Sequence, residues 1–241
     1  MIEVRNLNVS FDEKVVLQSV DLDVLKGNIV VIMGKNGEGK SVFLKAIAGL
    51  LDSYSGEIKI KNKEQKLNDQ EFMFGYVFQK GGLFDSMNVF ENIAFPLKRL
   101  KMNTIVIEER VYGALKRVGL EGSHLKAPSE LSGGMQKRVG IARAICFEPE
   151  ILLYDDPTAG LDPILSDSIA DLILEIRESL QTTSIAVTHD LAVANKIADY
   201  IGLLYNGELI FYDTKKEFFS KNNIYAKQFI NGDLEGPIDI Y

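Results

Sequence analysis

A glycine-rich segment that ends in Lys-Ser is the part of the sequence whose residue types and spacing could most directly do chemistry. It reads Gly34-Lys35-Asn36-Gly37-Glu38-Gly39-Lys40-Ser41 and fits the phosphate-loop pattern G-x-x-x-x-G-K-[ST]. Glycines allow consecutive backbone N–H groups to face a phosphate, and the N-terminus of a following helix adds partial positive charge. In this pattern Lys40 reaches the β- and γ-phosphates and Ser41 binds Mg²⁺. The segment therefore predicts a nucleoside triphosphate site.

Two adjacent carboxylates, Asp155 and Asp156, follow the apolar run at residues 151–154. An acid at the end of such a strand holds Mg²⁺ in P-loop enzymes. Strand ends also often carry Asp in ordinary turns, so Asp155 taken alone fits either interpretation equally well.

A second glycine pair lies in Leu131-Ser132-Gly133-Gly134-Met135-Gln136, at the start of a helical pattern. Ser132 is a favourable N-cap residue, and a purely structural interpretation of this segment is open. The alternative is a second anion site, because the exposed N–H groups of a helix N-terminus bind phosphate well.

The composition is that of an ordinary globular protein, with 46% hydrophobic and 25% charged residues among 241. The net charge of -7 disfavours a nucleic-acid partner, because phosphate-backbone binding depends on clustered Lys and Arg. The apolar runs are shorter than the ~20 residues of a spanning helix, and we expect any membrane role to come through a partner. The single Cys146 lies in an apolar helical pattern and is expected to be a buried thiol.

The elements expected around these motifs alternate between strand and helix, which indicates an α/β fold with a parallel sheet. Alternating polarity predicts an antiparallel hairpin near the N-terminus, and a continuous apolar run before the phosphate loop predicts a strand buried on both faces. A mainly helical region follows, interrupted near Pro96 and Pro128, before the strand signal returns. In order, the expected elements are strands 2–11 and 15–24, strand 29–33, helix 41–51, strand 56–60, a polar loop through Asn68, strand 73–79, helical region 89–147, strand 151–154, a helix with apolar positions 169–180, strand 184–188, and a hairpin turning at Asn206-Gly207.

Taken together, these motifs resemble those of the ATP-binding subunits of ABC transporters, and the resemblance covers almost the whole chain. The motifs that carry it, in chain order, are Phe11 at the position that stacks on adenine, Gly34 to Ser41 as Walker A, Gln79 as the Q-loop, Ser132 to Gln136 as the signature, Asp155 as the Walker B acid, Ala159-Gly160-Leu161-Asp162 as the D-loop and His189 as the switch histidine. Alone, Phe11 and His189 would be structural residues and Gln79 a surface residue. Their order in the series favours the functional interpretation.

The resemblance implies a RecA-like P-loop core with an N-terminal antiparallel β layer and a helical signature subdomain at about residues 88–148. The nucleotide-binding domain would span residues 1–230, followed by an acidic tail at residues 231–241, for which composition favours a loosely held segment over one that braces a neighbouring subunit. It further implies that the chain binds ATP and Mg²⁺. The residues implied are Asp156, His189 and Gln79 in catalysis; Ser41, Gln79 and Asp155 at the metal; and Phe11, Gly34, Lys35, Asn36, Gly37, Glu38, Gly39, Lys40, Ser41, Ser132, Gly133, Gly134, Gln136 and Asp162 at the nucleotide.

In this family two nucleotides lie between two chains arranged head to tail, each between one chain's Walker A loop and the other chain's signature. The resemblance therefore implies a homodimer with two equal sites, since a two-fold interface uses the same patch twice. ATP would hold this dimer closed and hydrolysis would release it.

The sequence departs from the family pattern at Asp156, where the family usually has Glu as the residue that polarises the attacking water. A misplacement of ~1 Å at a catalytic group can reduce a rate on the order of a hundredfold, so we expect slow hydrolysis unless the backbone compensates. A dimer that closes on ATP and scarcely hydrolyses it is the alternative. Glu38 is a second unusual residue, and its side chain is expected to point away from the phosphates while its amide contributes to the loop.

A finer resemblance concerns the transported substrate. The Q-loop region from Phe78 to Leu97, the segment Ser41-Val42-Phe43-Leu44-Lys45 and the C-terminal Gln228 to Ile238 are similar to the ATPases of Mce-type lipid transporters, the Mla phospholipid-trafficking group. This implies a transmembrane permease docked at the Q-loop groove, an indirect lipid-binding Mce-type partner, and a peripheral location on the cytoplasmic face of a bacterial inner membrane. The apolar wall of that groove would consist of Leu83, Phe84 and Phe90, and the same groove would suit the permease of another transporter.

Overall fold

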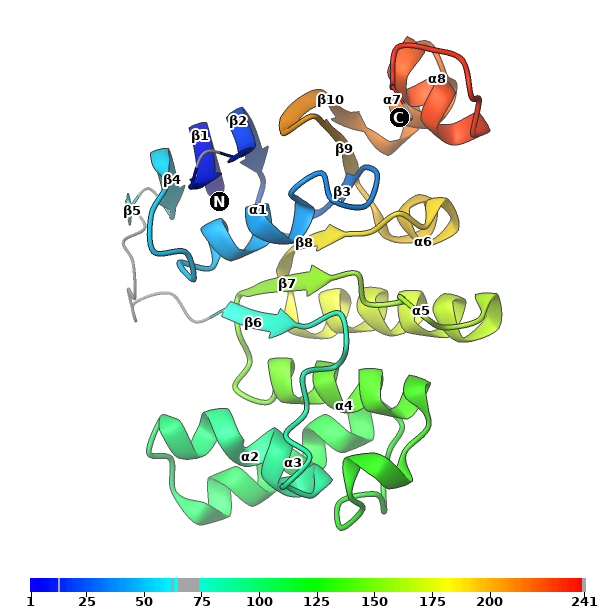
Figure 1. The fold of residues 1–241 in the computed structure, drawn as a ribbon. Coiled ribbons are helices and arrows are strands. Elements are labelled where there is room, and N and C mark those ends of the chain that lie inside the picture. Colours follow the sequence, from blue (N-terminus) through cyan, green and yellow to red (C-terminus); the bar gives the residue numbers. More distant parts are fainter. Residues whose placement is uncertain (13, 62, 65–73, 240–241) are drawn as a thin grey trace. The chain divides into compact units, whose positions relative to one another are not determined.

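A computed structural model describes residues 1–12, 14–61, 63, 64 and 74–239 of the chain (Figure 1). The chain forms two compact units. The first unit comprises Met1–Phe72 and Thr183–Tyr241, and the second comprises Met73–Thr182. The polar loop expected through Asn68 lies outside the described residues. Among the residues that the structure does describe, no helix has both the length and the apolar character needed to cross a membrane.

The first unit begins with an antiparallel β layer formed by β1 (Ile2–Phe11), β2 (Lys14–Val24), β4 (Ser55–Ile60) and β5 (Lys63–Glu64), in the order β2-β1-β4-β5. Inward-facing residues of β1 alternate with exposed ones, and Ile2, Val4, Leu7 and Val9 are buried. Alternating polarity predicts this arrangement, in which one face of the strand is apolar and packs against the core and the other face is exposed to solvent. The predicted N-terminal hairpin and the predicted strand 56–60 are confirmed.

The first unit also contains parallel strands, β3 (Ile29–Met33), β8 (Thr183–Val187) and β9 (Tyr200–Tyr205), followed by the antiparallel β10 (Glu208–Thr214). All residues of β3 and β8 are buried, as their continuous apolar or small side chains predict. The turn between β9 and β10 has positive φ at both Asn206 and Gly207, which matches the hairpin chemistry of an Asn-Gly pair.

Helices α1 (Lys40–Ile47) and α6 (Leu191–Ile197) follow strands β3 and β8. Helix α1 buries Phe43, Leu44 and Ile47. It ends earlier than the predicted helix 41–51, because Ala48 is the C-cap and Gly49 takes a left-handed conformation.

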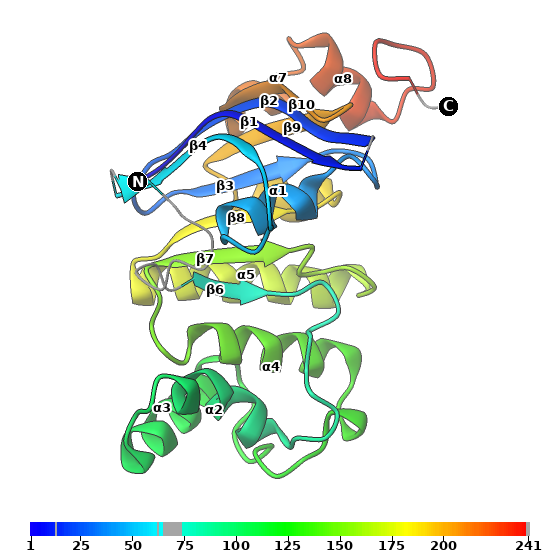
Figure 2. The same cartoon turned by 60° about the vertical axis from the view of Figure 1, so that its left-hand side comes forward.

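The first unit ends with α7 (Lys215–Ser220), α8 (Ile224–Asn231) and an ordered C-terminal segment (Figure 2). The amide of Gln228 on α8 donates to the carbonyls of Asp233 and Ile238, and its oxygen accepts from Ile238 N at 2.7 Å. Gln228 and Ile238 are both buried. The composition of the tail favoured a loosely held segment, yet one buried side-chain amide on the preceding helix binds its backbone at Asp233 and Ile238.

The second unit contains the parallel strands β6 (Phe74–Val77) and β7 (Ile151–Asp155), with Val77 paired to Tyr154. Its helices are α2 (Val89–Arg99), α3 (Thr104–Arg117), the short 3₁₀ helix η1 (Pro128–Glu130), α4 (Gly133–Ile145) and α5 (Pro163–Leu180). Strand β6 is shorter than the predicted strand 73–79, since the chain leaves the ladder after Val77 and places Phe78 and Gln79 in a loop.

The helical region is interrupted near Pro96, as expected, but the break follows Arg99 at the end of α2 and does not lie at the proline itself. Pro96 lies inside α2, which starts with a reciprocal capping box between Asn88 and Glu91. The helix buries Ile93 and Leu97 on either side of Pro96, and this packing keeps it continuous despite the missing amide. Pro128, by contrast, does mark a break, because it begins η1 between α3 and α4.

Candidate nucleotide-binding site

The phosphate loop of the first unit connects β3 directly to α1. Gly34 has φ +152°, and a Cβ there would lie 2.4 Å from the carbonyl oxygen of Leu204. Gly39 has φ +94°, and a Cβ there would lie 2.9 Å from the carbonyl oxygen of Val16. Both positions therefore need glycine for the backbone to take this path.

Lys40 is the first residue of α1, and its side chain folds back over the loop. Its Nζ donates to the carbonyl of Gly34 at 2.8 Å and to that of Lys35 at 2.6 Å. The residue is buried, with 9% of its surface exposed. The loop thus encloses a cation at the N-terminus of a helix, next to the hydroxyl of Ser41, and this donor set suits a phosphate group.

The other polar side chains of the loop are engaged with neighbouring segments of the first unit. The Glu38 carboxylate accepts from Asn206 N at 2.5 Å, so this acid is engaged with the β9–β10 turn. Lys35 donates to the carbonyl of Asp239 and lies near the ring of Tyr205. The loop is therefore held from the β9–β10 hairpin and from the C-terminal segment, while Asn36 and Gly37 stay exposed.

His189 lies at the same sheet edge of the first unit as the phosphate loop. Strands β3 and β8 are parallel neighbours with Ile32 paired to Val187, so their carboxyl ends coincide. The loop leaves β3 at that edge, and His189 follows β8 there, just before Asp190 caps α6. Ligands bind outside the carboxyl ends of parallel strands in α/β folds.

Phe11 lies at the end of β1, paired with Lys14 across the hairpin, and half of its surface is exposed. Val16 on the returning strand approaches Gly39. The hairpin that carries Phe11 therefore borders the phosphate loop, and the exposed ring is available for stacking.

In the second unit the two carboxylates stand where β7 ends. Asp155 and Asp156 each have 7% of their surface exposed. The hydroxyl of Tyr76 on β6 donates to Asp155 Oδ2 at 3.1 Å. Burial raises the pKa of Tyr76, and the charge and hydrogen bond of Asp155 raise it further, so the phenol stays protonated and keeps donating.

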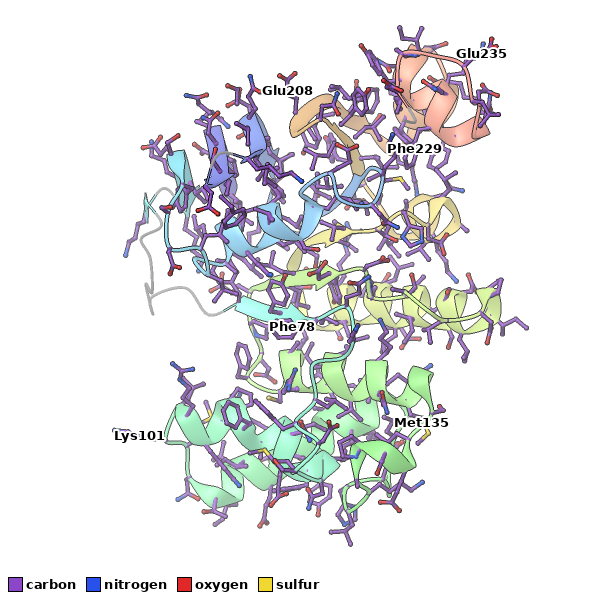
Figure 3. The ribbon with its side chains drawn as sticks, viewed as in Figure 1. Phe78, Lys101, Met135, Glu208, Phe229 and Glu235 are labelled. Carbon is purple, nitrogen blue, oxygen red and sulfur yellow. The ribbon has the colours of Figure 1, made fainter. Side chains whose placement is uncertain are left out.

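Gln79 follows β6, the parallel neighbour of β7, so it leaves the sheet at the same edge as the carboxylates. Its side chain is exposed. Phe78 before it is also 40% exposed, and Figure 3 shows it on the segment that leaves β6. The second unit thus brings Gln79 and the acidic pair to one edge of the sheet.

The signature residues of the second unit form the N-terminus of α4. Ser132 is the N-cap and its Oγ accepts from Met135 N at 3.3 Å, so the capping interpretation is confirmed. The side-chain amide of Gln136 donates through Nε2 to the carbonyl of Pro128 at 2.9 Å. Gly133 and Gly134 have no Cβ that would cover the backbone N–H groups in the first turn of α4. These groups could therefore still bind a phosphate, although Ser132 caps the helix.

Asp162 is the N-cap of α5, and its carboxylate accepts from the amides of Ile164 and Leu165 at 2.9 Å each. The methyl groups of Leu165 lie close to Gly134. The starts of α4 and α5 therefore meet, and the segments predicted as signature and D-loop are neighbours in the second unit.

Lys137 is the residue of this region that the sequence analysis did not identify. It lies in the first turns of α4 with 6% of its surface exposed. Burial lowers the pKa of its ammonium group, and the charges of Asp156 and Asp155 oppose that shift. Most residues of α4 are buried, and Lys137 is one of them, although lysine is usually found at the protein surface.

The aromatic residues expected at the permease groove belong to two separate pairs. Phe84 packs against Phe95 with ring centroids 4.9 Å apart, and Phe90 packs against Tyr112 at 5.9 Å. The guanidinium of Arg143 lies 5.7 Å from the ring centroid of Phe84. The exposed apolar surface after the Q-loop therefore comprises Phe78, Phe84 and Phe95, whereas Phe90 and Leu83 are half-buried.

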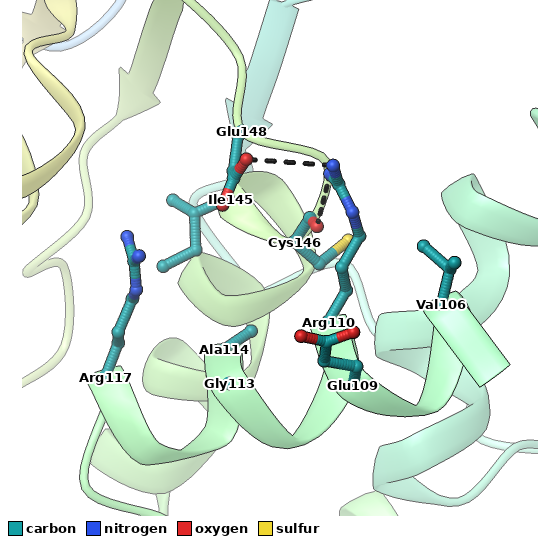
Figure 4. Close-up of a pocket in the computed structure, with 9 residues that line it drawn as sticks. All are labelled: Val106, Glu109, Arg110, Gly113, Ala114, Arg117, Ile145, Cys146 and Glu148. Carbon is teal, nitrogen blue, oxygen red and sulfur yellow. Dashed lines mark hydrogen bonds and ion pairs between the residues drawn. The ribbon is translucent and has the colours of Figure 1, made fainter.

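A pocket of about 390 Å³ lies between α3 and the C-terminal end of α4 (Figure 4). Arg110 spans it, with contacts to the Glu148 carboxylate at 3.7 Å and the Cys146 carbonyl at 3.3 Å. Burial raises the pKa of Cys146 to about 12, which keeps the thiol protonated, as its expected core position implies. None of the residues expected at the nucleotide lines this pocket, whose lining is Val106, Glu109, Arg110, Gly113, Ala114, Arg117, Ile145, Cys146 and Glu148.

The α/β fold with a phosphate loop after a buried parallel strand defines a P-loop nucleoside triphosphatase. The sequence profile of the ABC transporter family matches residues 17–159. The chain belongs to the ABC transporter family, as an ATPase subunit.

Three curated relatives match nearly the whole chain. The intermembrane phospholipid transport system ATP-binding protein MlaF of Haemophilus influenzae is 36% identical over 99% of this chain and 93% of its own length. The probable ribonucleotide transport ATP-binding protein mkl of Mycobacterium leprae is 37% identical over 98% of this chain and 70% of its own length. The methionine import ATP-binding protein MetN of Clostridium tetani is 37% identical over 91% of this chain and 71% of its own length.

Solved structures of ABC transporter cassettes have the same fold. CbiO1 of Clostridium perfringens, part of the ABC transporter complex cbiONQ, superimposes with a TM-score of 0.83 at 31% identity, over 95% of this chain and 94% of that chain. The dimeric bacterial ABC transporter cassette MJ0796 superimposes with a TM-score of 0.79 at 34% identity, over 89% of this chain and 99% of that chain. The RecA-like α/β architecture with an antiparallel β layer is thereby confirmed.

Proposed function

We propose that this chain is the ATP-hydrolysing motor subunit of a bacterial transporter that moves phospholipid across the cell envelope together with an Mce-type complex. The observation that carries the proposal is the likeness to the phospholipid-transport protein MlaF, which spans almost the full length of both chains. The resemblance of two segments to the Mla group also supports it: the region that follows Gln79, as far as Leu97, and the C-terminal segment from Gln228 to Ile238.

The residues around the phosphate loop fit ATP. Lys40 is held inside the loop by two carbonyls and would bind the β- and γ-phosphates, with the loop amides from Gly34 to Ser41 around them. Phe11 would stack on the adenine. Ser132, Gly133, Gly134, Gln136 and Asp162 of a second copy would complete the nucleotide site.

The donor set also fits Mg²⁺, which prefers oxygen ligands and keeps several waters when it is bound with a nucleotide. Within the described ranges no group of three His, Cys, Asp or Glu side chains forms a metal cluster, and few protein ligands are the usual case for this ion. We assign Ser41, Gln79 and Asp155 to hold it. When bound, Mg²⁺ neutralises charge that develops on the phosphates.

We assign the activation of the attacking water to Asp156, with His189 and Gln79 orienting the reacting groups. The carboxylate of Asp156 can accept a proton only if it faces the attacking water. Because the side chain of Asp is one methylene shorter than that of Glu, the position of the Asp156 backbone determines whether the carboxylate reaches the water. The assignment includes slow turnover, because the family usually has a longer acid at this position.

The dimer and the permease follow from the same proposal. The relative MJ0796 forms a dimer, and we propose a head-to-tail homodimer for this chain. We place the permease at Phe84, Leu83 and Phe90, whose exposed or half-buried rings and side chain offer an apolar wall. Docking there would hold the chain at the cytoplasmic face of the inner membrane.

Copurification tests the proposed cargo. The tagged chain is extracted from its native membranes in mild detergent, and the copurifying proteins and lipids are identified by mass spectrometry. A polytopic permease together with an Mce-type subunit and phospholipid is the expected result. A variant with Phe84→Asp serves as the matched control, because it should lose the permease while its ATPase activity remains.

The second candidate is the motor of an amino-acid importer, which the 37% identity to MetN favours, because it is close to the 36% identity to MlaF. The same experiment separates the two. Recovery of a permease without an Mce-type subunit or phospholipid would overturn the lipid proposal and leave the motor assignment in place. Absence of any membrane partner would overturn both transport assignments and favour a regulatory dimer.

A further inference from the structure

A buried cation on α4 joins two loops of the second unit. The Lys137 ammonium group donates to the backbone carbonyl of Gln79, in the loop after β6, and contacts the carbonyl oxygen of Asp156, after β7, at 3.4 Å. Both loops leave the sheet at the edge where the acidic pair stands. One side chain thus contacts the backbone of two residues that are assigned to catalysis.

The burial of this lysine needs a reason beyond packing. Transfer of an ammonium group from water into a protein interior is unfavourable unless it is paired and hydrogen-bonded. Lys137 has both, through the two carbonyls and through the nearby charges of Asp155 and Asp156. An apolar side chain of similar length would fill the same space without the desolvation penalty, so packing alone does not require a lysine here.

The backbone of Asp156 is the part of this network under most strain. Its φ is +44°, in the left-handed region that residues other than glycine rarely adopt. Such conformations persist where surrounding contacts hold them, often at functional sites. The Asp156 carbonyl accepts from Ala159 N at 3.1 Å and also contacts Lys137, so the turn and the lysine both fix the direction of this peptide.

Neighbouring cations on α4 have different partners. Arg138 donates to the carbonyl of Val118 at 2.6 Å and to Ser168 Oγ at 2.8 Å, and so ties α4 to the end of α3 and to α5. Arg143 donates to the carbonyls of Gly82 and Gly81 further along the Q-loop. Of these three cations, Lys137 is the one whose hydrogen bonds reach Asp156.

We propose that Lys137 is a positioning residue for ATP hydrolysis, which links the Q-loop backbone at Gln79 to the Asp156 peptide and so sets where the Asp156 carboxylate lies. The inference rests on the proposed role of Asp156 and is independent of the transported substrate. By fixing the Asp156 peptide, Lys137 would also place the Asp156 backbone so that its carboxylate, one methylene shorter than that of Glu, still reaches the attacking water.

The test compares Lys137→Met, Lys137→Gln and Lys137→Arg with Arg138→Met in the full-length chain. We measure phosphate release to obtain kcat and KM for Mg-ATP, ATP binding by calorimetry, and Tm. We expect Lys137→Met to lower kcat about 10- to 100-fold, since small displacements of a catalytic group have effects of this size, with KM and ATP affinity changed less than about threefold. Lys137→Arg should recover part of kcat, because it restores a cation that can donate to both carbonyls.

Arg138→Met removes a cation one residue away that contacts neither Gln79 nor Asp156. It should lower Tm and leave kcat unchanged below the unfolding temperature. If Lys137→Met does not fold, the same kcat-against-KM comparison is made with Lys137→Gln, which keeps a donor without the charge.

Three results would overturn the inference. Wild-type kcat in both neutral Lys137 variants would show that the contact has no role in turnover. Equal losses of ATP affinity and kcat, with no recovery by Lys137→Arg, would show a merely structural lysine. A wild-type chain that binds ATP and releases no phosphate would overturn the motor function itself, and the role of Lys137 with it.

Discussion

Asp156 combines two features that bear on turnover, an acid side chain one methylene shorter than the usual glutamate and a left-handed backbone. We expect Asp156→Asn to remove the residual ATPase activity, because an amide cannot accept the proton of the attacking water. ATP binding should persist, since the phosphate loop is unchanged. Phosphate release and calorimetry on the same preparation check both statements.

The matched variant at this position is Asp156→Glu. It restores the longer acid, so its kcat shows whether side-chain length limits the rate. Turnover in Asp156→Asn equal to that of the wild type would contradict the assignment of Asp156 as the base.

Cys146 provides a prediction about reactivity. Its pKa of about 12 exceeds pH 8 by about four units, so only about one molecule in ten thousand would carry the reactive thiolate at that pH. Burial is the main cause of this shift, and the thiol also donates to the carbonyls of Ile93 and Arg143. We expect iodoacetamide to leave the folded chain unlabelled at pH 8 and to label it in urea. Rapid labelling of the folded chain would contradict this.

At the residue scale, the sequence predicted those features that depend on local patterns. The phosphate loop was predictable because its glycines, lysine and serine are consecutive and their geometry is local. Lys137 was not predictable, because its burial depends on how α4 packs against distant segments. The same holds for the two aromatic pairs, since Phe84 and Phe90 are close in sequence but face different helices.

At the element scale, Gln228 determines whether the C-terminal segment stays attached to α8. We expect Gln228→Ala to lower the free energy of unfolding by about 1–3 kcal/mol, because it removes hydrogen bonds to buried backbone groups. Denaturant unfolding measures this loss. Limited proteolysis should also cleave the variant faster near Asp233.

Lys227→Ala is the control, because Lys227 is exposed on the same helix. It should match the wild type in both assays. Equal protease resistance in Gln228→Ala would show that other contacts of the segment, such as that of Asp239 N with the Tyr205 hydroxyl at 2.8 Å, are sufficient.

The elements that sequence patterns located best are the fully buried strands β3 and β7 and the helix α5, whose buried residues recur at helical spacing. Predictions were least exact where a local signal competed with packing. Pro96 is a helix breaker by its own chemistry, yet buried neighbours keep α2 intact. The C-terminal segment has the composition of a loose tail, yet the buried side-chain amide of Gln228 hydrogen-bonds its backbone.

At the scale of the whole molecule, the chain belongs to a family of ATPases, and no helix among its described residues could span a membrane. The ATPase motifs could be predicted because nucleotide chemistry needs fixed residue types at fixed spacing. The cargo could not be derived in the same way, because relatives of similar identity are named for phospholipid, ribonucleotide and methionine transport.

The proposed head-to-tail dimer makes a prediction that only the whole assembly can test. Lys40→Ala damages the phosphate loop and Ser132→Arg damages the signature, so each homodimer has two damaged nucleotide sites. Neither variant alone should dimerise with Mg-ATP in analytical ultracentrifugation. An equimolar mixture should dimerise, because a mixed dimer concentrates both lesions in one site and leaves the other intact. In the alternative arrangement, each chain supplies both the phosphate loop and the signature of its own nucleotide site. Every site in the mixture would then carry one lesion, and the mixture would stay monomeric.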